Sequence, residues 1–478
     1  MRAQIKTLSQ QTLIYGAGHI FARMITFLLL PLYTNVFGRG EYGVISLAYI
    51  FMGFMAVIVR YGMDSALMRH YISATRADRK AYLSTVYVSY LISTILFVLV
   101  FHLLRYRIDE AILGGEYPEF ITIISLIIAF DLLWFVPTLL MRSEEKPLPY
   151  ITISLLNVGL SLTLNLLLVL KFHMGIRGVL ISNLVTSCFL FTITLPYVIV
   201  RIELKSISIS LWKKMMKFGL PFLPAGIFAM LMELSGRYIL KYMTDLNTVG
   251  LYSSGYKLGA LMLLVVMGFN MGWQPFFLKT NIEKDRKRIF ARIATYVMAI
   301  LGFIWILLVV WVEDIIQLEI MGVTLYGEAY WASTVFVPWV ALGYFFFAAY
   351  NLQLPGVFIS EKTKWVALIR GLGAGSTIGL NFLFIYYFGA IGAALATCLS
   401  FMIMAIAMFL VNRSIFPIVY EWSRLVRIGI FMIMTIILFL SFDLSFNGKL
   451  LITVLYPFGL LLTGFLTKDE KQVLFNWR

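Results

Sequence analysis

Long runs of apolar residues, separated by short charged or turn-forming segments, extend along this chain from end to end. A helix needs about 20 consecutive apolar residues to cross a bilayer, and fourteen runs come close to that length. The pattern therefore predicts an all-α, polytopic membrane protein with about 14 spans. The predicted spans are residues 12–36, 43–68, 83–104, 120–141, 150–171, 176–200, 218–241, 250–276, 289–312, 331–356, 365–387, 390–411, 425–441 and 450–466.

Composition supports this interpretation and excludes other classes of protein. Of the 478 residues, 61% are hydrophobic and 13% are charged, whereas soluble domains have roughly 45–50% apolar and about 25% charged residues. A soluble enzyme and a nucleic-acid-binding protein are excluded, and so is an outer-membrane barrel, whose strands alternate apolar and polar residues. The two cysteines, Cys188 and Cys398, lie in apolar runs, so we expect neither a disulfide framework nor a metal site.

The basic residues predict the orientation in the membrane. Lys and Arg exceed Asp and Glu by 39 to 24, a net charge of +15. With fourteen spans both termini lie on one side, and the segments on that side hold 26 of the Lys and Arg residues against 7 on the other side. The positive-inside rule then places both termini in the cytoplasm. This rule accounts for the basic loops 213–217 and 284–288, and contact with anionic lipid is the alternative explanation.

Polar and glycine motifs recur between the two halves of the chain, which indicates an internal duplication. Six spans separate the members of each pair, so the repeat is parallel, with a pseudo-two-fold axis along the membrane normal. The first pair is Phe37-Gly-Arg-Gly-Glu-Tyr-Gly43 and Thr244-Asp-Leu-Asn-Thr-Val-Gly250. The others are Ser143-Glu144-Glu-Lys146 with Ser360-Glu361-Lys362, Leu164-Asn165 with Leu380-Asn381, and Gly175-Ile-Arg-Gly178 with Gly389-Ala-Ile-Gly392.

The repeat predicts two six-span lobes that enclose a central cavity and expose it to each side of the membrane in turn. Asn165 and Asn381 occupy matching positions in it, and we expect both to bridge helices. The predicted organisation is an N-lobe at residues 1–200, a cytoplasmic linker at 201–217, a C-lobe at 218–411, and two further spans with a cytoplasmic tail at 412–478.

Three stretches carry a resemblance to a known family: Leu32-Tyr-Thr-Asn-Val-Phe-Gly-Arg-Gly-Glu-Tyr-Gly43, Tyr61-Gly-Met-Asp-Ser-Ala-Leu-Met-Arg-His70, and Leu380-Asn381 with Gly389-Ala-Ile-Gly-Ala-Ala-Leu-Ala-Thr397. In these stretches the sequence resembles the oligosaccharide (O-antigen-type) flippases of the multidrug/oligosaccharidyl-lipid/polysaccharide exporter superfamily. The resemblance covers nearly the whole chain, including its arrangement of six, six and two spans. It implies that undecaprenyl-diphosphate-linked oligosaccharide is moved from the cytoplasmic to the periplasmic leaflet of a bacterial inner membrane. The stretch around Lys171 is two residues longer than its C-lobe counterpart.

Ionisable residues inside the spans are the candidate functional residues, because charge is costly in a bilayer. The cations are in excess, and a cationic cavity suits a diphosphate, whose oxygens arginine binds in bidentate fashion. The spacing i, i+4 predicts two same-face pairs, Arg60 with Asp64 and Glu233 with Arg237. The candidate substrate-binding residues are Arg23, Arg60, Arg237, Lys257 and Arg370, and the candidates for ion coupling or charge pairing are Asp64, Asp131 and Glu233.

Three other functions remain alternatives: a multidrug or organic-cation antiporter, a lipid II flippase, and a membrane-embedded polysaccharide polymerase or ligase. An antiporter would favour acidic residues in its cavity. A polymerase needs a sizeable outer loop, and the longest one predicted is 313–330. The sequence contains neither a P-loop motif nor a His-Glu-x-x-His motif, so we expect no cofactor, no metal and no enzymatic activity. Expected partners are the lipid-linked oligosaccharide, the bilayer and other polysaccharide-assembly proteins, with no nucleic acid and a monomeric state.

Overall fold

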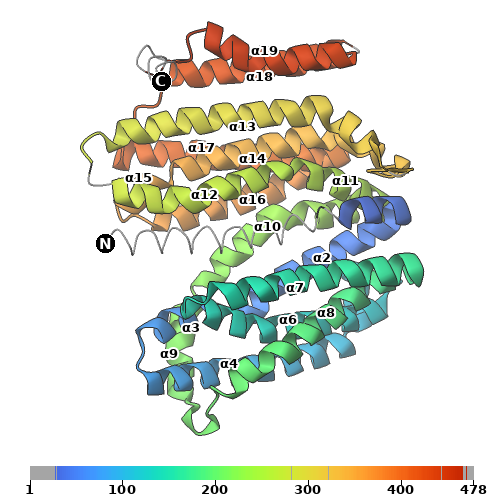
Figure 1. The fold of residues 1–478 in the computed structure, drawn as a ribbon, viewed down its shortest axis with the longest axis vertical. Helices are drawn as coiled ribbons and strands as arrows, with labels where there is room; N and C mark the ends of the chain where they lie inside the picture. The colour runs from blue at the N-terminus through green and yellow to red at the C-terminus, as the bar shows by residue number, and fades with distance from the viewer. Residues whose placement is uncertain are drawn as a thin grey trace. The chain divides into compact units, whose positions relative to one another are not determined.

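The computed structural model describes residues 27, 29–280, 283–320, 322–442, 444–466 and 470, and most of them are helical (Figure 1). Twelve described helical segments are long and apolar enough to cross a membrane. The predicted class, an all-α polytopic membrane protein, is confirmed. The predicted first span, 12–36, falls mostly outside the described residues, and the predicted last span corresponds to the shorter apolar helix α19 (Phe446–Leu462).

The chain folds into two compact units, Met1–Ser253 and Ser254–Arg478. Helix α11 (Leu246–Gly259) continues from the first unit into the second. The predicted lobe boundaries rest on the sequence repeat and stay a prediction. The other elements of the first unit are α2 (Arg39–Arg60), α3 (Met63–Ser73), α4 (Arg76–Leu103), α5 (Arg105–Ile112), α6 (Pro118–Ser143), α7 (Pro147–Asn165), η1 (Leu166–Lys171), α8 (Gly175–Ile199), η2 (Leu204–Ser206), α9 (Ile209–Gly219) and α10 (Phe222–Met243).

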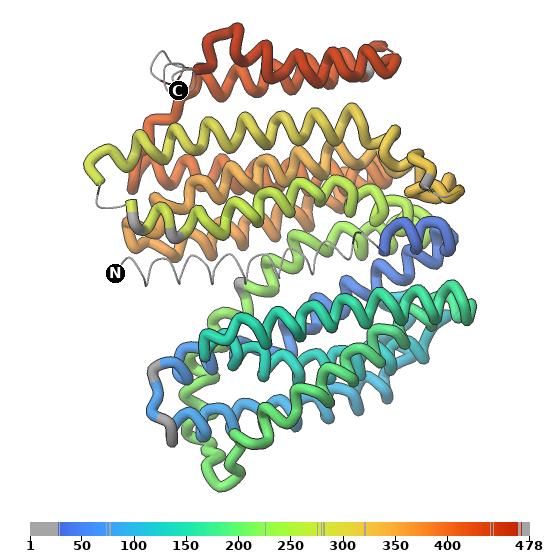
Figure 2. Tube along the Cα trace, viewed as in Figure 1, coloured from blue at the N-terminus to red at the C-terminus, as the bar shows by residue number. Residues whose placement is uncertain are grey.

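In the first unit, helix α6 is the central element (Figure 2). It packs against α2, α4, α7 and α8. Its apolar residues lie on all sides of the helix, which is the pattern of a helix surrounded by others. Pro137 lies inside α6, a position that membrane helices tolerate when neighbouring groups satisfy the freed carbonyl.

The second unit repeats this packing with equivalent helices. The contact between α4 and α6 corresponds to that between α13 and α14. In the same way, the contact of α6 with α8 corresponds to that of α14 with α17, and the contact of α7 with α8 to that of α16 with α17. Helix α18 packs on α13 and on α19, beside which it lies in Figure 1. The elements of this unit are α12 (Leu261–Thr280), α13 (Arg286–Gln317), β1 (Glu319–Ile320), β2 (Val323–Thr324), η3 (Glu328–Phe336), α14 (Val337–Leu352), α15 (Leu354–Ile359), α16 (Lys364–Phe388), α17 (Ala390–Ile415), α18 (Trp422–Ser441) and α19.

The turns between helices refine the sequence repeat by one residue. Glu145 and Glu361 both adopt φ of 54°, and the backbone hydrogen bonds around them follow the same order. Glu145 is therefore the counterpart of Glu361, and Glu144 is the counterpart of Ser360. The sequence match, which paired Glu144 with Glu361, is wrong by one position because it compared side-chain identity and not backbone conformation. The extra residues near Lys171 are accommodated by the π-helix η1 and the turn after it.

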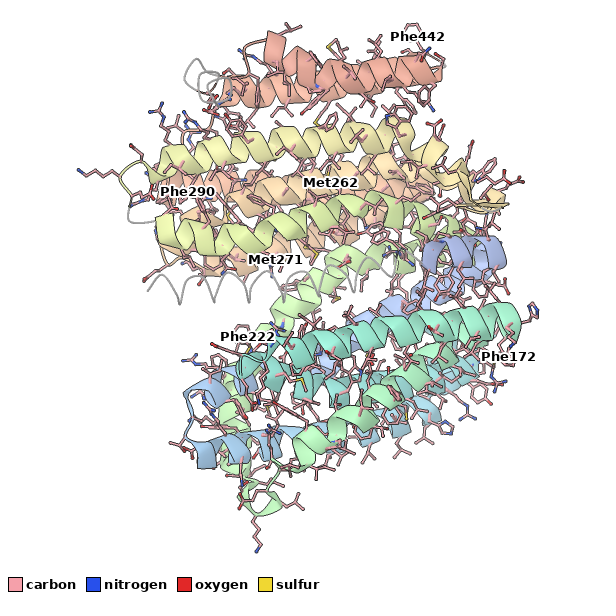
Figure 3. The ribbon with its side chains drawn as sticks, in the orientation of Figure 1. Phe172, Phe222, Met262, Met271, Phe290 and Phe442 are labelled. Atoms are coloured by element: carbon pink, nitrogen blue, oxygen red, sulfur yellow. The ribbon has the colours of Figure 1, made fainter. Side chains whose placement is uncertain are left out.

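Large apolar side chains occupy both the interior and the surface. Met262 and Phe290 are buried, whereas Phe172, Phe222 and Phe442 are exposed (Figure 3). A soluble monomer does not expose apolar side chains on this scale. The exposed residues lie along helices long enough to cross a membrane, so we assign them to contact with lipid.

Candidate functional site

The structure distributes the predicted site residues over both units. Arg23 lies outside the described residues. Arg60, Asp64, Asp131, Glu233 and Arg237 belong to the first unit, and Lys257 and Arg370 belong to the second unit. Each unit therefore carries two of the predicted cations that the structure describes.

Arg60 and Asp64 belong to two different helices. Helix α2 ends at Arg60, because Tyr61 (φ 32°) and Gly62 (φ 76°) adopt left-handed backbone conformations before α3 begins. Residues four apart share a face only in a continuous helix, so the predicted same-face pair is wrong. The Arg60 guanidinium lies instead over the Phe135 ring of α6, 4.0 Å from its centroid, a favourable cation–π arrangement.

Asp131 is held by neighbouring helices. One carboxylate oxygen accepts hydrogen bonds from Trp134 Nε1 of α6 at 2.9 Å and from Ser187 Oγ of α8 at 2.6 Å. The positive charge of Arg60 also acts on this carboxylate. A lone carboxylate is expensive inside a membrane, and these three interactions offset part of that cost. Among the described residues no ion pair joins Arg60 to Asp131, so the hydrogen bonds within α6 and from α8 are the direct contacts that hold this carboxylate.

Glu233 and Arg237 lie on one face of the continuous helix α10. Arg237 is buried and donates a hydrogen bond through Nη1 to the backbone carbonyl oxygen of Glu233 at 3.3 Å. Its guanidinium carbon also lies 6.0 Å from the centroid of the Tyr252 ring in α11. Arg237 therefore places a positive charge in a buried position within a membrane-spanning helix.

The two cations of the second unit are half-buried. Lys257 lies near the end of α11, next to Tyr256, whose hydroxyl is 2.7 Å from the Tyr344 hydroxyl of α14. Arg370 belongs to α16 and lies beside the hydroxyl of Tyr350 in α14. Arg370 therefore adjoins a tyrosine hydroxyl group in the interior of this unit.

A buried polar network in the first unit includes residues that the sequence did not single out. The Tyr33 hydroxyl donates to Asn165 Oδ1 at 2.9 Å, and Asn165 Nδ2 donates to Ser182 Oγ at 2.6 Å. Asn183 Nδ2 donates to the Tyr49 hydroxyl at 2.8 Å. The prediction that Asn165 bridges helices is confirmed. Tyrosine and serine occur too widely in membrane helices for their type alone to have marked the other members.

Asn381, the repeat counterpart of Asn165, differs from it. Its Nδ2 donates to the carbonyl oxygen of Thr377 in its own helix at 2.7 Å, as Asn165 does to the carbonyl of Ser161. Within the described part of the chain, Asn381 Oδ1 has no hydrogen-bond partner. The predicted bridge between helices is therefore seen for Asn165 alone of the two.

Helices α2 and α11 cross at two equivalent glycines. A Cβ atom added to Gly43 would overlap the carbonyl oxygen of Leu246, and one added to Gly250 would overlap the carbonyl oxygen of Arg39. The repeat pairs Gly43 with Gly250, and the same offset pairs Arg39 with Leu246. The contact is therefore self-complementary, as at a two-fold axis. Only glycine lets the two backbones approach this closely.

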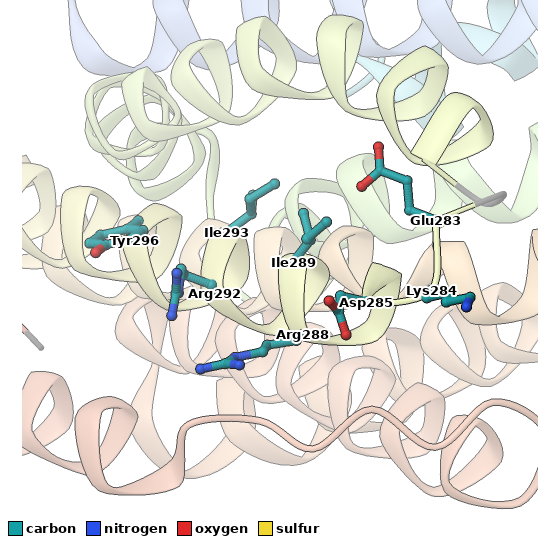
Figure 4. Close-up of a pocket in the computed structure, with 8 residues that line it drawn as sticks. All are labelled: Glu283, Lys284, Asp285, Arg288, Ile289, Arg292, Ile293 and Tyr296. Carbon is teal, nitrogen blue, oxygen red and sulfur yellow. The ribbon is translucent and has the colours of Figure 1, made fainter. Parts of the chain in front are cut away.

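The described residues of the second unit line pockets of two kinds. One, of about 700 Å³, lies at the start of α13 and mixes basic with acidic residues (Figure 4). It includes Arg288 and Arg292 together with Glu283 and Asp285, so its charges are partly balanced. The other pocket, of about 380 Å³, is almost entirely apolar and is lined by residues of α13, α14, α17 and α18 and of the segment before α18.

A carboxylate outside the spans holds the ends of three helices together. Glu144 accepts hydrogen bonds from the Tyr71 hydroxyl of α3, the Tyr197 hydroxyl of α8 and Lys146 Nζ, each at 2.7 Å. Arg201 Nε lies 3.7 Å from the same carboxylate. Burial alone would raise the pKa of Glu144, but the hydrogen bonds from Lys146, Tyr197 and Tyr71 outweigh it and lower the pKa to about 2.

The fold is shared with solved transporter structures. The lipid II flippase MurJ in an inward closed conformation superimposes with a TM-score of 0.76 at 15% identity, covering 96% of this chain and 99% of that one. An inward-facing multidrug resistance MATE family transporter of the MOP superfamily superimposes with a TM-score of 0.66 at 14% sequence identity. This match covers 88% of this chain and 95% of that one. The Vibrio cholerae MATE transporter VcmN D35N mutant superimposes with a TM-score of 0.57 at 16% sequence identity, and the match covers 85% of this chain and 96% of that one.

The fold is therefore that of the flippase-type and multidrug transporters of this superfamily. The family model described as polysaccharide biosynthesis protein matches residues 8–281, more than half of the chain. The chain belongs to this polysaccharide biosynthesis protein family. A search of curated proteins found no match.

Proposed function

We propose that the chain is a flippase that moves an undecaprenyl-diphosphate-linked oligosaccharide, the repeat unit of O-antigen or a related polysaccharide. It would carry this lipid from the cytoplasmic to the periplasmic leaflet of a bacterial inner membrane, with both chain termini in the cytoplasm. The observation that carries the proposal is the set of cations inside the spans of a polysaccharide biosynthesis protein with a transporter fold. Arg237 is the clearest member, because it is buried in a membrane-spanning helix.

The cations suit the charge of this substrate. Arg23, Arg60, Arg237, Lys257 and Arg370 are proposed to attract the diphosphate, whose oxygens match the guanidinium group. Asp131 is proposed to hold α6 against α8 rather than to carry a coupling ion, since its carboxylate already accepts two hydrogen bonds. The apolar pocket of about 380 Å³ has the chemistry to accommodate part of a polyprenyl chain.

The crossing at Gly43 and Gly250 is proposed to close the transporter on one side during alternating access. A contact made by equivalent residues of two repeats can open symmetrically when the repeats rock against each other. At the two glycines the backbones touch directly, so this contact can open without the movement of a side chain at either glycine.

The test is replacement of Arg23, Lys257 and Arg370 by glutamine in a strain that lacks the chromosomal gene. We expect each variant to reach the membrane but to lose export, so that lipid-linked repeat units accumulate in the cytoplasmic leaflet. Lys171→Gln removes an exposed cation from a span end predicted to face the periplasm and serves as the matched control. Normal export by all three variants would contradict the proposal. Export of organic cations with unchanged oligosaccharide transport would favour a multidrug antiporter instead.

A further inference from the structure

The segment between α8 and α10 contains a short amphipathic helix, α9 (Ile209–Gly219), whose role the proposed transport activity does not explain. Ser208 caps its N-terminus by accepting a hydrogen bond from the Leu211 backbone N–H. One face of α9 packs on α3 and α4, where Met215 and Gly219 are buried. Trp212 Nε1 also donates to Ser89 Oγ of α4 at 2.9 Å. This face is therefore fixed to the first unit.

The opposite face of α9 is basic and exposed. Ile209, Lys213, Lys217 and Leu220 follow one another at intervals of three or four residues, which places them on one side of the helix, and all four are exposed. Among the described residues, neither Lys213 nor Lys217 has an ion-pair partner. Both ammonium groups are thus available to an anionic partner.

A third lysine adds to the positive potential near this helix. Lys214 Nζ donates to the Tyr82 hydroxyl of α4 at 3.2 Å, and Tyr82 stacks on His70 of α3 with 5.2 Å between the ring centroids. Burial lowers the pKa of His70, and the positive charges of Lys214 and Arg69 lower this pKa further. The surroundings of α9 therefore disfavour additional positive charge.

The connection to α10 places α9 at the membrane surface. Only Leu220 and Pro221 separate the end of α9 from α10, which is a candidate membrane span. Phe222, the first residue of α10, and Ile209 at the other end of α9 are exposed apolar residues, with 50% and 70% of their surface accessible. Basic residues flanked by apolar ones are the pattern of a helix that lies at the bilayer interface.

We propose that the exposed face of α9 binds the headgroups of anionic phospholipids and so anchors the ends of α3 and α4 to the membrane surface. Anionic headgroups complement Lys213 and Lys217, and the flanking Ile209 and Leu220 enter the apolar edge of the leaflet. The anchor acts directly on α3, because the backbones of Gly219 in α9 and Gly62 before α3 are in contact. This binding site is independent of the cations inside the spans.

The test is lipid binding to the purified full-length protein, measured by native mass spectrometry with phosphatidylglycerol or zwitterionic phosphatidylcholine. We expect the wild-type protein to prefer phosphatidylglycerol. Lys213→Gln/Lys217→Gln should weaken that binding by about thirtyfold, the effect of two lysines at an anionic surface. Lys213→Arg/Lys217→Arg should retain it. About 1 M salt should remove the preference, because it shortens the screening length to about 3 Å.

The matched control is Lys171→Gln/Arg177→Gln, which removes the same charge from exposed positions at span ends predicted to face the periplasm. We expect this variant to bind phosphatidylglycerol as the wild type does. Equal binding of the two lipids by the wild-type protein would overturn the proposal, and so would an unchanged affinity in Lys213→Gln/Lys217→Gln. An equal loss in both charge-removal variants would indicate a general effect of net charge and would also overturn it.

Discussion

Replacing Gly250 with alanine tests whether the crossing of α2 and α11 takes part in transport. The added methyl group would overlap the carbonyl oxygen of Arg39, and the corresponding change at Gly43 would overlap that of Leu246. Ordinary contact begins at 3.4 Å, so the helices must separate by more than about 1 Å. Overpacking of this kind costs about 1–3 kcal/mol, which lowers the population of the closed contact roughly 5- to 150-fold.

Export should fall accordingly in Gly250→Ala and in Gly43→Ala. The double variant should lose less than the sum of the two effects, because both methyl groups disturb the same contact. The assay is restoration of surface polysaccharide in a strain that lacks the gene, with the amount of protein in the membrane measured in parallel. Gly53→Ala is the control, because it lies in the same helix and its Cβ would meet nothing within 4 Å. Export by Gly250→Ala equal to that of the control would show that transport does not depend on this crossing.

Three further predictions concern the interior and the helix ends. The pKa of Glu144 is lowered to about 2, so the ionised carboxylate should stabilise the fold fully above the usual glutamate pKa near 4.5. This stabilisation, about 1–2 kcal/mol, should fade as the pH drops from there toward 2. Thermal unfolding of Glu144→Gln should lack this pH dependence. Asp131→Ala should destabilise the protein by about 1–3 kcal/mol, because Trp134 Nε1 and Ser187 Oγ would lose their shared acceptor. Asp131→Asn keeps an acceptor oxygen and should cost less; equal losses in unfolding experiments would argue against this role. Asn165→Ala should cost about 1–2 kcal/mol in unfolding experiments, and Asn381→Ala should cost less, because fewer partners hold that side chain.

The sequence predicted the spans well because the length of an apolar run reports directly on the thickness of the bilayer. Helices α6, α8, α16 and α17 begin and end within a few residues of the predicted limits. The break between α2 and α3 was not predicted. It depends on a left-handed conformation at Tyr61, which a residue with a side chain rarely adopts and which the apolar pattern does not reveal.

The candidate site was predictable only in part. Polarity within an apolar run identified Asp131 and Asn165 as residues that need partners. It could not name the partners, because Ser187, Tyr33 and Ser182 come from other helices, whose packing the apolar pattern does not reveal. The spacing i, i+4 suggested Asp64 as the partner of Arg60, but the helix break separates these two residues and tertiary packing brings Arg60 to Phe135.

The extent of the first compact unit determines when its helices can pack against one another during synthesis. This unit extends to Ser253, and α10 packs along α2, with the Tyr238 hydroxyl donating to the Leu47 carbonyl at 3.1 Å. A nascent chain that has been synthesised only to residue 217, the end of the predicted linker, does not yet contain α10. The face of α2 that contacts α10 is then without its partner. Domains fold as units during translation, beginning at the N-terminus. Helix α2 therefore completes its packing only after several later spans have left the ribosome.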